Sequence, residues 1–205
     1  MKKLVVAIVT AFVLWFLMFS PLTAGYVNFW FAMSLSAVVL TAMAFAMRGK
    51  LIVGNIRFSW RNLAIGVGSA AVLWGVFWLG NYFSNQLFDF AQGQVAGVYA
   101  MKTGENQLVI ALLLLFVIGP AEEIFWHGLV QSELTKKIAS PCVIIVTTLI
   151  YSLVHLPSLN FMLIMAAFVC GLFWSAIYYY NRNLLTVLVS HALWDVSVFV
   201  LFPIS

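Results

Sequence analysis

Six ionisable side chains fall within or at the edges of long apolar stretches of this chain, and their types suit proton transfer or metal binding. They are two adjacent glutamates, one aspartate and all three histidines of the sequence: Glu122, Glu123, His127, His155, His191 and Asp195. An ionisable group in hydrocarbon costs roughly 3 kcal/mol on insertion scales, so such groups pair with one another and mark functional sites. Carboxylates beside imidazoles are the groups that activate water in general-base or zinc-dependent hydrolysis.

The spacing within AEEIFWHGLVQ separates the roles of the two glutamates. Glu123 and His127 are four residues apart and share a helical face, whereas Glu122 lies about 100° away around the helix. We therefore expect Glu123 to bond to His127 and Glu122 to point into a cavity. Gly119 and Pro120 just before them predict a loosened or kinked helix, because proline lacks a backbone donor. The acids would then open a fresh helical turn, where the helix dipole favours negative charge.

The other two histidines differ in their surroundings. His191 and Asp195 repeat the four-residue spacing, so the carboxylate is predicted to orient the imidazole and fix its tautomer. His155 stands alone at the end of the apolar run TTLIYSLVHLP. By itself, a histidine in that place is more often a satisfied interface residue than a catalyst.

The elements that must position these groups are membrane helices. Of the 205 residues, 64% are hydrophobic and 8% are charged, which lies outside the range of soluble globular proteins. Apolar runs near or above roughly 18 residues recur along the whole length. We predict an all-α fold, a polytopic transmembrane helical bundle, with residues 1–205 as a single integral membrane domain and 108–200 as the motif-bearing catalytic core. The net charge of +4 is modest and indicates no nucleic-acid partner.

We predict about seven spans from the apolar runs. They are roughly Leu4 to Phe19, Val27 to Met47, Leu63 to Phe83, Leu108 to Leu134, Ile138 to His155, Phe161 to Tyr180 and Leu184 to Leu201. The first span has the charged start and apolar middle of a signal peptide, but it lacks a small-x-small cleavage site and is predicted to be retained.

The positive charges predict how these spans cross the cell membrane. Seven crossings leave only Lys102 on one side and gather the other nine lysines and arginines on the opposite side. This predicts a cytoplasmic N-terminus and an outer C-terminus. A straight fifth span would leave His155 far from Glu122, so either the spans differ or residues 155–161 dip into the protein.

In order along the chain, three of these patterns resemble the signature motifs of a known family. Glu-Glu-x-x-x-His, Tyr-x-x-x-His and His-x-x-x-Asp resemble the EExxxR, FxxxH and HxxxN/D motifs of the CPBP family, the CAAX-protease and bacteriocin-processing intramembrane proteases also called Abi. The resemblance implies an intramembrane endopeptidase that acts on a peptide or membrane-associated protein substrate in the lipid bilayer. It implies catalytic roles for Glu122, His155 and His191, and supporting roles for Glu123, His127 and Asp195.

Two positions depart from the family pattern. His127 stands where the family has arginine, and Tyr151 stands where it usually has phenylalanine. An arginine would always be charged, whereas a histidine holds a neighbouring carboxylate ionised only when it is protonated. The tyrosine adds a hydroxyl that needs a hydrogen-bond partner.

Two hydrolytic routes are compatible with one carboxylate and two histidines. In a metal-free route Glu122 is the general base, and His155 and His191 assist and stabilise the oxyanion. In a metal route the same three side chains bind Zn²⁺, which keeps an open position for water. We prefer the metal-free route with no cofactor and keep zinc as the alternative.

Two other classes of function are open. A catalytically silent immunity or scaffold protein of the membrane is indicated only by the histidine at position 127. A proton-coupled transporter is less favoured, because intramembrane acids and histidines can relay protons but the chain has neither an inverted repeat nor paired broken helices.

Overall fold

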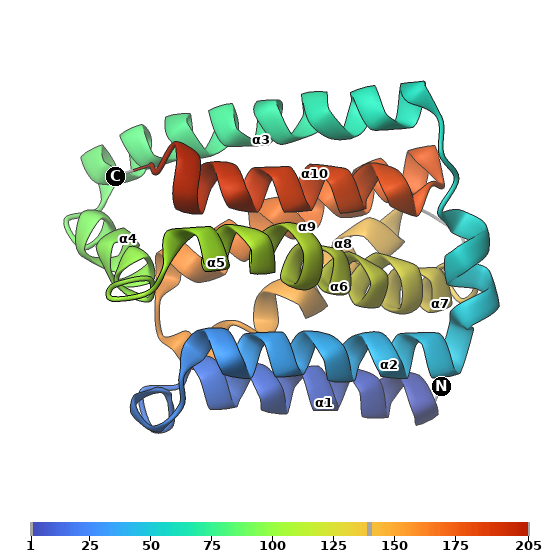
Figure 1. The fold of residues 1–205 in the computed structure, drawn as a ribbon, viewed down its shortest axis with the longest axis horizontal. Coiled ribbons are helices and arrows are strands. Elements are labelled where there is room, and N and C mark those ends of the chain that lie inside the picture. Colours follow the sequence, from blue (N-terminus) through green and yellow to red (C-terminus); the bar gives the residue numbers. More distant parts are fainter. Residues whose placement is uncertain (1, 139–140, 205) are drawn as a thin grey trace.

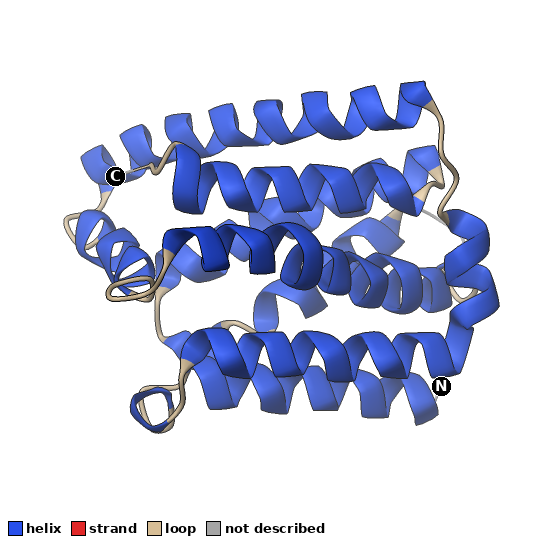
Figure 2. Ribbon diagram, viewed as in Figure 1, coloured by secondary structure: helices blue, strands red, loops and turns tan. Residues whose placement is uncertain are grey.

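The computed structural model describes residues 2–138 and 141–204, and every regular element within those ranges is a helix (Figure 2). The predicted all-α fold is confirmed. The longer helices are α1 (Lys2–Phe19), α2 (Phe29–Asn55), α3 (Trp60–Leu87), α4 (Ala91–Ala100), α8 (Cys142–Leu153), α9 (Phe161–Asn181) and α10 (Leu184–Val196). Short helical turns η1 (Ala24–Tyr26), η4 (Leu156–Ser158) and η5 (Ser197–Leu201) lie between or after them.

One helical stretch carries the two glutamates. It runs without a break through α5 (Gln107–Leu113), η2 (Leu114–Ile118), α6 (Gly119–Glu123), η3 (Ile124–Gln131) and α7 (Ser132–Thr135). The Gly119 amide donates to the Leu114 carbonyl, five residues back, so the helix widens to a π turn just before Pro120. Such π turns are frequent at functional sites. The loosening predicted at this point is therefore a π turn within a continuous helix. Glu122 lies in the first turn of the α-helical segment that follows, as predicted.

The described residues contain six helices long and apolar enough to cross a membrane, and the protein is a multi-pass membrane protein. These stretches are Lys2–Phe19, Phe29–Asn55, Trp60–Leu87, Gln107–Thr135, Phe161–Asn181 and Leu184–Leu201. Cys142–Ser158 is a shorter apolar helix in the place of the predicted fifth span. Two residues at the predicted start of that span, Ala139 and Ser140, lie outside the described residues.

The short helix α8 resolves the depth problem of His155. Its 12 residues extend only about 18 Å, against a hydrocarbon core of about 30 Å. After it the chain turns through η4 and through Leu159, which has a left-handed φ of 51°, before α9 starts at the Asn160 cap. His155 is consequently buried inside the bundle, whereas Leu156, Leu159 and Phe161 are exposed. The first alternative therefore holds: the fifth helix is shorter than the predicted span.

Helix α10 lies between α3 and the glutamate-bearing stretch (Figure 1). Two glycines permit this close packing, since a Cβ at Gly66 of α3 would lie 2.9 Å from the Thr186 carbonyl oxygen, and one at Gly119 would lie 3.1 Å from the Cα of Ala192. Small residues allow helices to associate in lipid, where burial of apolar surface provides no drive. The contact at Gly119 brings the glutamates against the helix turn that carries His191.

The two ends of the described chain lie at opposite ends of the bundle (Figure 1). The α2–α3 connection lies at the same end as the N-terminus, as the predicted sorting of basic residues requires. Near that end Glu133 forms ion pairs with Arg48 and with Lys136, the latter at 2.6 Å. The orientation of these ends relative to the cytoplasm stays a prediction.

Candidate active site

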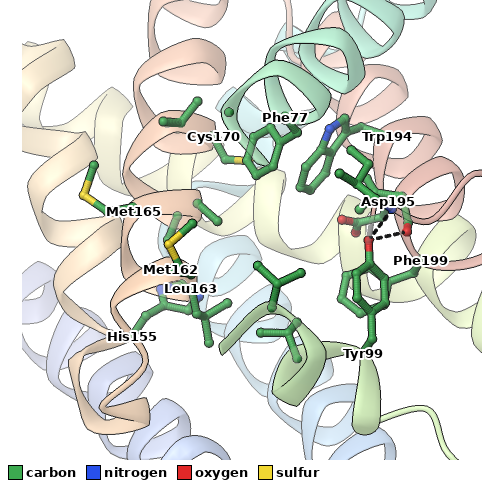
Figure 3. A pocket seen from close by; sticks show the side chains of 18 of the residues that line it. Phe77, Tyr99, His155, Met162, Leu163, Met165, Cys170, Trp194, Asp195 and Phe199 are labelled. Atoms are coloured by element: carbon green, nitrogen blue, oxygen red, sulfur yellow. Dashed lines mark hydrogen bonds between the residues drawn. The ribbon is translucent and has the colours of Figure 1, made fainter. Parts of the chain in front are cut away.

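A cavity of about 500 Å³ lies inside the bundle, and the three candidate catalytic residues share its wall. Figure 3 shows His155 and Asp195 on this wall. Glu122 reaches it from α6, His155 from the turn after α8, and His191 from α10. Tyr151 and Asp195 also line it. Most of the remaining wall is apolar, so the ionisable groups lie together in largely apolar surroundings.

Glu122 has the cavity on one side and a hydroxyl donor on the other. The Tyr151 O–H donates to Glu122 Oε2 at 3.0 Å, and both side chains are buried. The hydroxyl that distinguishes this chain from the family pattern thus finds its partner on the candidate general base. The tyrosine holds one carboxylate oxygen in place while the carboxylate remains part of the cavity wall.

Glu123 joins two histidines and is only 1% exposed. Its Oε2 lies 2.6 Å from His127 Nδ1, the contact that the four-residue spacing predicts. Its Oε1 lies 2.7 Å from His191 Nδ1, on another helix. Because an ionised carboxylate can only accept hydrogen bonds, both Nδ1 atoms donate to it. The second contact was not foreseen from sequence, since it depends on the approach of α6 to α10.

His191 is held on three sides. Besides Glu123 at Nδ1, its Nε2 lies 3.4 Å from Asp195 Oδ2, a long contact. The Trp174 ring lies flat against the imidazole, with centroids 3.8 Å apart and planes at 20°. Asp195 was predicted to orient the imidazole and fix its tautomer. The shorter hydrogen bond is instead the one that Nδ1 donates to Glu123, and Nε2 has only the long contact to Asp195.

Both ring nitrogens of His155 have partners. Nδ1 lies 3.0 Å from the Tyr151 carbonyl oxygen and donates to it, which leaves a lone pair on Nε2. The Trp15 indole N–H donates to that lone pair at 3.0 Å. Trp15 is 1% exposed and belongs to α1, far away in sequence. No motif or spacing in the sequence pointed to this contact.

The far end of the cavity is closed by α4. The buried part of Tyr99 lines the cavity, and its O–H donates to the Val198 carbonyl while accepting from the Ile204 amide (Figure 3). Burial raises the pKa of the Tyr99 hydroxyl, which therefore stays protonated and able to donate. This hydroxyl fixes the segment after α10 against the cavity wall.

Residues 104–197 match the family model described as type II CAAX prenyl endopeptidase Rce1-like. Over this segment the chain is similar to the CAAX-protease family. The matched segment contains all six ionisable residues singled out in the sequence, and the resemblance to the CPBP family is confirmed. No curated protein and no solved structure matches the chain. The family match supports an intramembrane endopeptidase, whereas Trp15 lies in a helix outside the matched segment.

The side chains as they stand do not fit a metal ion. Among the residues with described positions, no group of three or more His, Cys, Asp and Glu is placed to hold one. Each nitrogen of His155 and His191 already faces another polar group, namely Trp15, the Tyr151 carbonyl, Glu123 or Asp195. Binding of a zinc ion by Glu122, His155 and His191 would require these contacts to break.

Proposed function

We propose that the chain is an intramembrane endopeptidase that hydrolyses a peptide bond with a water molecule activated by Glu122. The observation that carries the proposal is the shared cavity, where Glu122, His155 and His191 meet although they come from separate elements of the fold. The match of residues 104–197 to the CAAX-protease family supports the same class of reaction.

The steps use groups that already face the cavity. Glu122 takes a proton from water, and the water oxygen attacks the carbonyl carbon of the substrate. In this step His191 carries a proton on both nitrogens, so Nδ1–H stays on Glu123 while Nε2–H donates a hydrogen bond to the carbonyl oxygen as it becomes an oxyanion. Only the long contact of Nε2 to Asp195 is given up. Glu122 then passes its proton to the leaving nitrogen as the C–N bond breaks. The products are one carboxylic acid and one amine.

The remaining polar groups hold this arrangement. Glu123 fixes the Nδ1 side of His191, and His127 supports Glu123 from the opposite side. His155 assists the reaction once a water molecule has replaced the Trp15 indole N–H as the hydrogen-bond partner of its Nε2. Water bound there would lie beside the same cavity as Glu122.

The cavity wall indicates what kind of substrate fits. It is lined largely by aliphatic and aromatic side chains from α3, α9 and α10, so it suits an apolar peptide segment or a membrane-associated protein that reaches it from the bilayer. We propose a cell-membrane location with a cytoplasmic N-terminus and an outer C-terminus, a single membrane domain, and no cofactor.

Peptide cleavage by the purified full-length protein tests the proposal. The protein in detergent is incubated with a library of apolar, membrane-derived peptides, and new termini are identified by mass spectrometry. Glu122→Gln, His155→Ala and His191→Ala should each abolish or strongly reduce cleavage, while Glu133→Gln, at the end of the bundle, should not. A chelator should leave turnover unchanged. Equal turnover by wild type and Glu122→Gln would refute the glutamate mechanism.

A catalytically silent member of the family is the second candidate. One observation favours it: the Trp15 indole occupies the His155 nitrogen that would otherwise be free to contact water. A silent protein would yield no new termini from any peptide, and Glu122→Gln would leave its cellular function intact.

A further inference from the structure

Trp174 is a buried tryptophan that stacks face to face on a candidate catalytic histidine, whereas Trp15 meets His155 edge-on. Its ring stacks on the His191 imidazole at 3.8 Å and 20°, whereas it meets Trp194 edge-on at 78°. Aromatic pairs in a core commonly adopt edge or offset arrangements, and a flat indole face is the one that attracts a cationic ring. The contact therefore has a geometry that suits the imidazole when it carries a proton on both nitrogens.

A chain of hydrogen bonds fixes the plane of this tryptophan. The Trp174 indole N–H donates to Ser190 Oγ at 3.1 Å. The hydroxyls of Ser190 and Ser69 lie 2.9 Å apart, and Ser69 Oγ lies 2.9 Å from the Gly66 carbonyl oxygen on α3. Ser190 is fully buried and directly precedes His191. The indole is thus tied to α3 and to the helix turn that carries the histidine.

Two carboxylates lie at the nitrogens on the edge of the imidazole, and a third lines the same cavity. Glu123 contacts Nδ1, Asp195 lies near Nε2, and Glu122 lines the same cavity. If the ring rotated about its Cβ–Cγ bond, both nitrogens would lose these partners. Because the stacked indole covers one face of the ring, it restricts that rotation.

We propose that Trp174 is a positioning residue for the reaction: by stacking on His191 it keeps Nδ1 on Glu123 and Nε2 directed at the cavity. The inference rests on the proposed function for its kinetic consequence. Its structural consequence, the fixed orientation of His191, can be measured without any substrate.

Three variants separate the aromatic face from the anchor. Trp174→Phe keeps an aromatic face but loses the N–H, Ser190→Ala removes only the partner of that N–H, and Trp174→Leu removes the face. We expect turnover to fall at least tenfold in Trp174→Leu with KM changed less than twofold. Trp174→Phe should retain more than a third of wild-type turnover, and Ser190→Ala should lie between the two. Trp74→Leu, in α3 with its N–H on the Phe202 carbonyl, is the control for loss of a tryptophan.

Nitrogen-15 NMR of histidine-labelled protein in detergent provides the second measurement. We expect wild type and Trp174→Phe to show a hydrogen-bonded His191 Nδ1–H proton protected from exchange, and Trp174→Leu to lose that protection. An unchanged Nδ1–H signal in Trp174→Leu would overturn the positioning role, as would parallel losses of kcat in Trp174→Phe and Trp174→Leu. If wild type cleaves no peptide, the proposed function fails, and the NMR comparison still decides the role of Trp174.

Discussion

Replacing each of the adjacent glutamates by glutamine should give two opposite phenotypes. Glu122 accepts a hydrogen bond from the Tyr151 hydroxyl, and a glutamine oxygen can keep that bond. Glu123 accepts from two buried histidines, and a glutamine presents an N–H to one of them in place of an oxygen. We therefore expect Glu122→Gln to lose activity and keep stability, and Glu123→Gln to lose stability.

The magnitudes follow from these contacts. Removal of a general base lowers turnover by about 10² to 10⁴-fold, which is the expectation for Glu122→Gln. Hydrogen bonds to charged groups contribute about 1.5–3 kcal/mol each in water-soluble proteins, but about 0.6–1.7 kcal/mol in membrane bundles. Two weakened bonds at the membrane value thus predict a loss of about 1–3 kcal/mol for Glu123→Gln. For a chain of this size that lowers Tm by about 2–12 °C.

Thermal unfolding in detergent and peptide cleavage are measured on the same preparations. Glu122→Gln should keep its Tm within about 2 °C of wild type, since its one hydrogen bond survives. Glu133→Gln is the matched control, because an exposed ion pair contributes no more than about 1 kcal/mol. The two roles would be reversed if Glu123→Gln had an unchanged Tm and no turnover while Glu122→Gln remained active.

Three further substitutions probe the surroundings of His155 and Glu122. Trp15→Phe keeps the ring packing but removes the indole N–H, which frees His155 Nε2 for water. Because water no longer has to displace a hydrogen bond of about 1 kcal/mol, kcat should rise about fivefold. A fall in kcat would mean that the reaction needs the indole N–H. Tyr151→Phe should lower kcat by less than about tenfold, because it removes one donor to Glu122 and leaves the carboxylate; full loss of activity would contradict this. Gly171→Ala would place a Cβ 2.9 Å from Tyr151 Cδ1, so it should displace the ring and reduce kcat at least as much as Tyr151→Phe; wild-type kcat would show that the ring moves without consequence.

Local spacing was enough to predict part of the site. Composition indicates membrane helices, and the i, i+4 rule predicts the bond between Glu123 and His127 because both residues lie on one continuous helix. The same rule predicts that His191 faces Asp195, although the observed contact is long. Motif order allowed the family to be recognised, since each motif is a short stretch of adjacent residues.

Contacts between helices required the tertiary structure. The bond from His191 to Glu123, the indole of Trp15 on His155 and the stacking of Trp174 on His191 all join residues on different elements. Helical periodicity fixes which face a residue occupies but not which neighbour that face meets. The length of α8 is a similar case, because hydropathy marks an apolar run without showing where its helix ends.

The sequence by itself determined the class of fold, the family and the identity of the ionisable residues, because these depend on composition and on short-range spacing. Only the tertiary structure decided that Glu122, His155 and His191 share one cavity and that Glu123 joins two histidines. The physical reason is the close approach of helices at Gly119 and the early end of α8, which together bring distant segments within hydrogen-bond range.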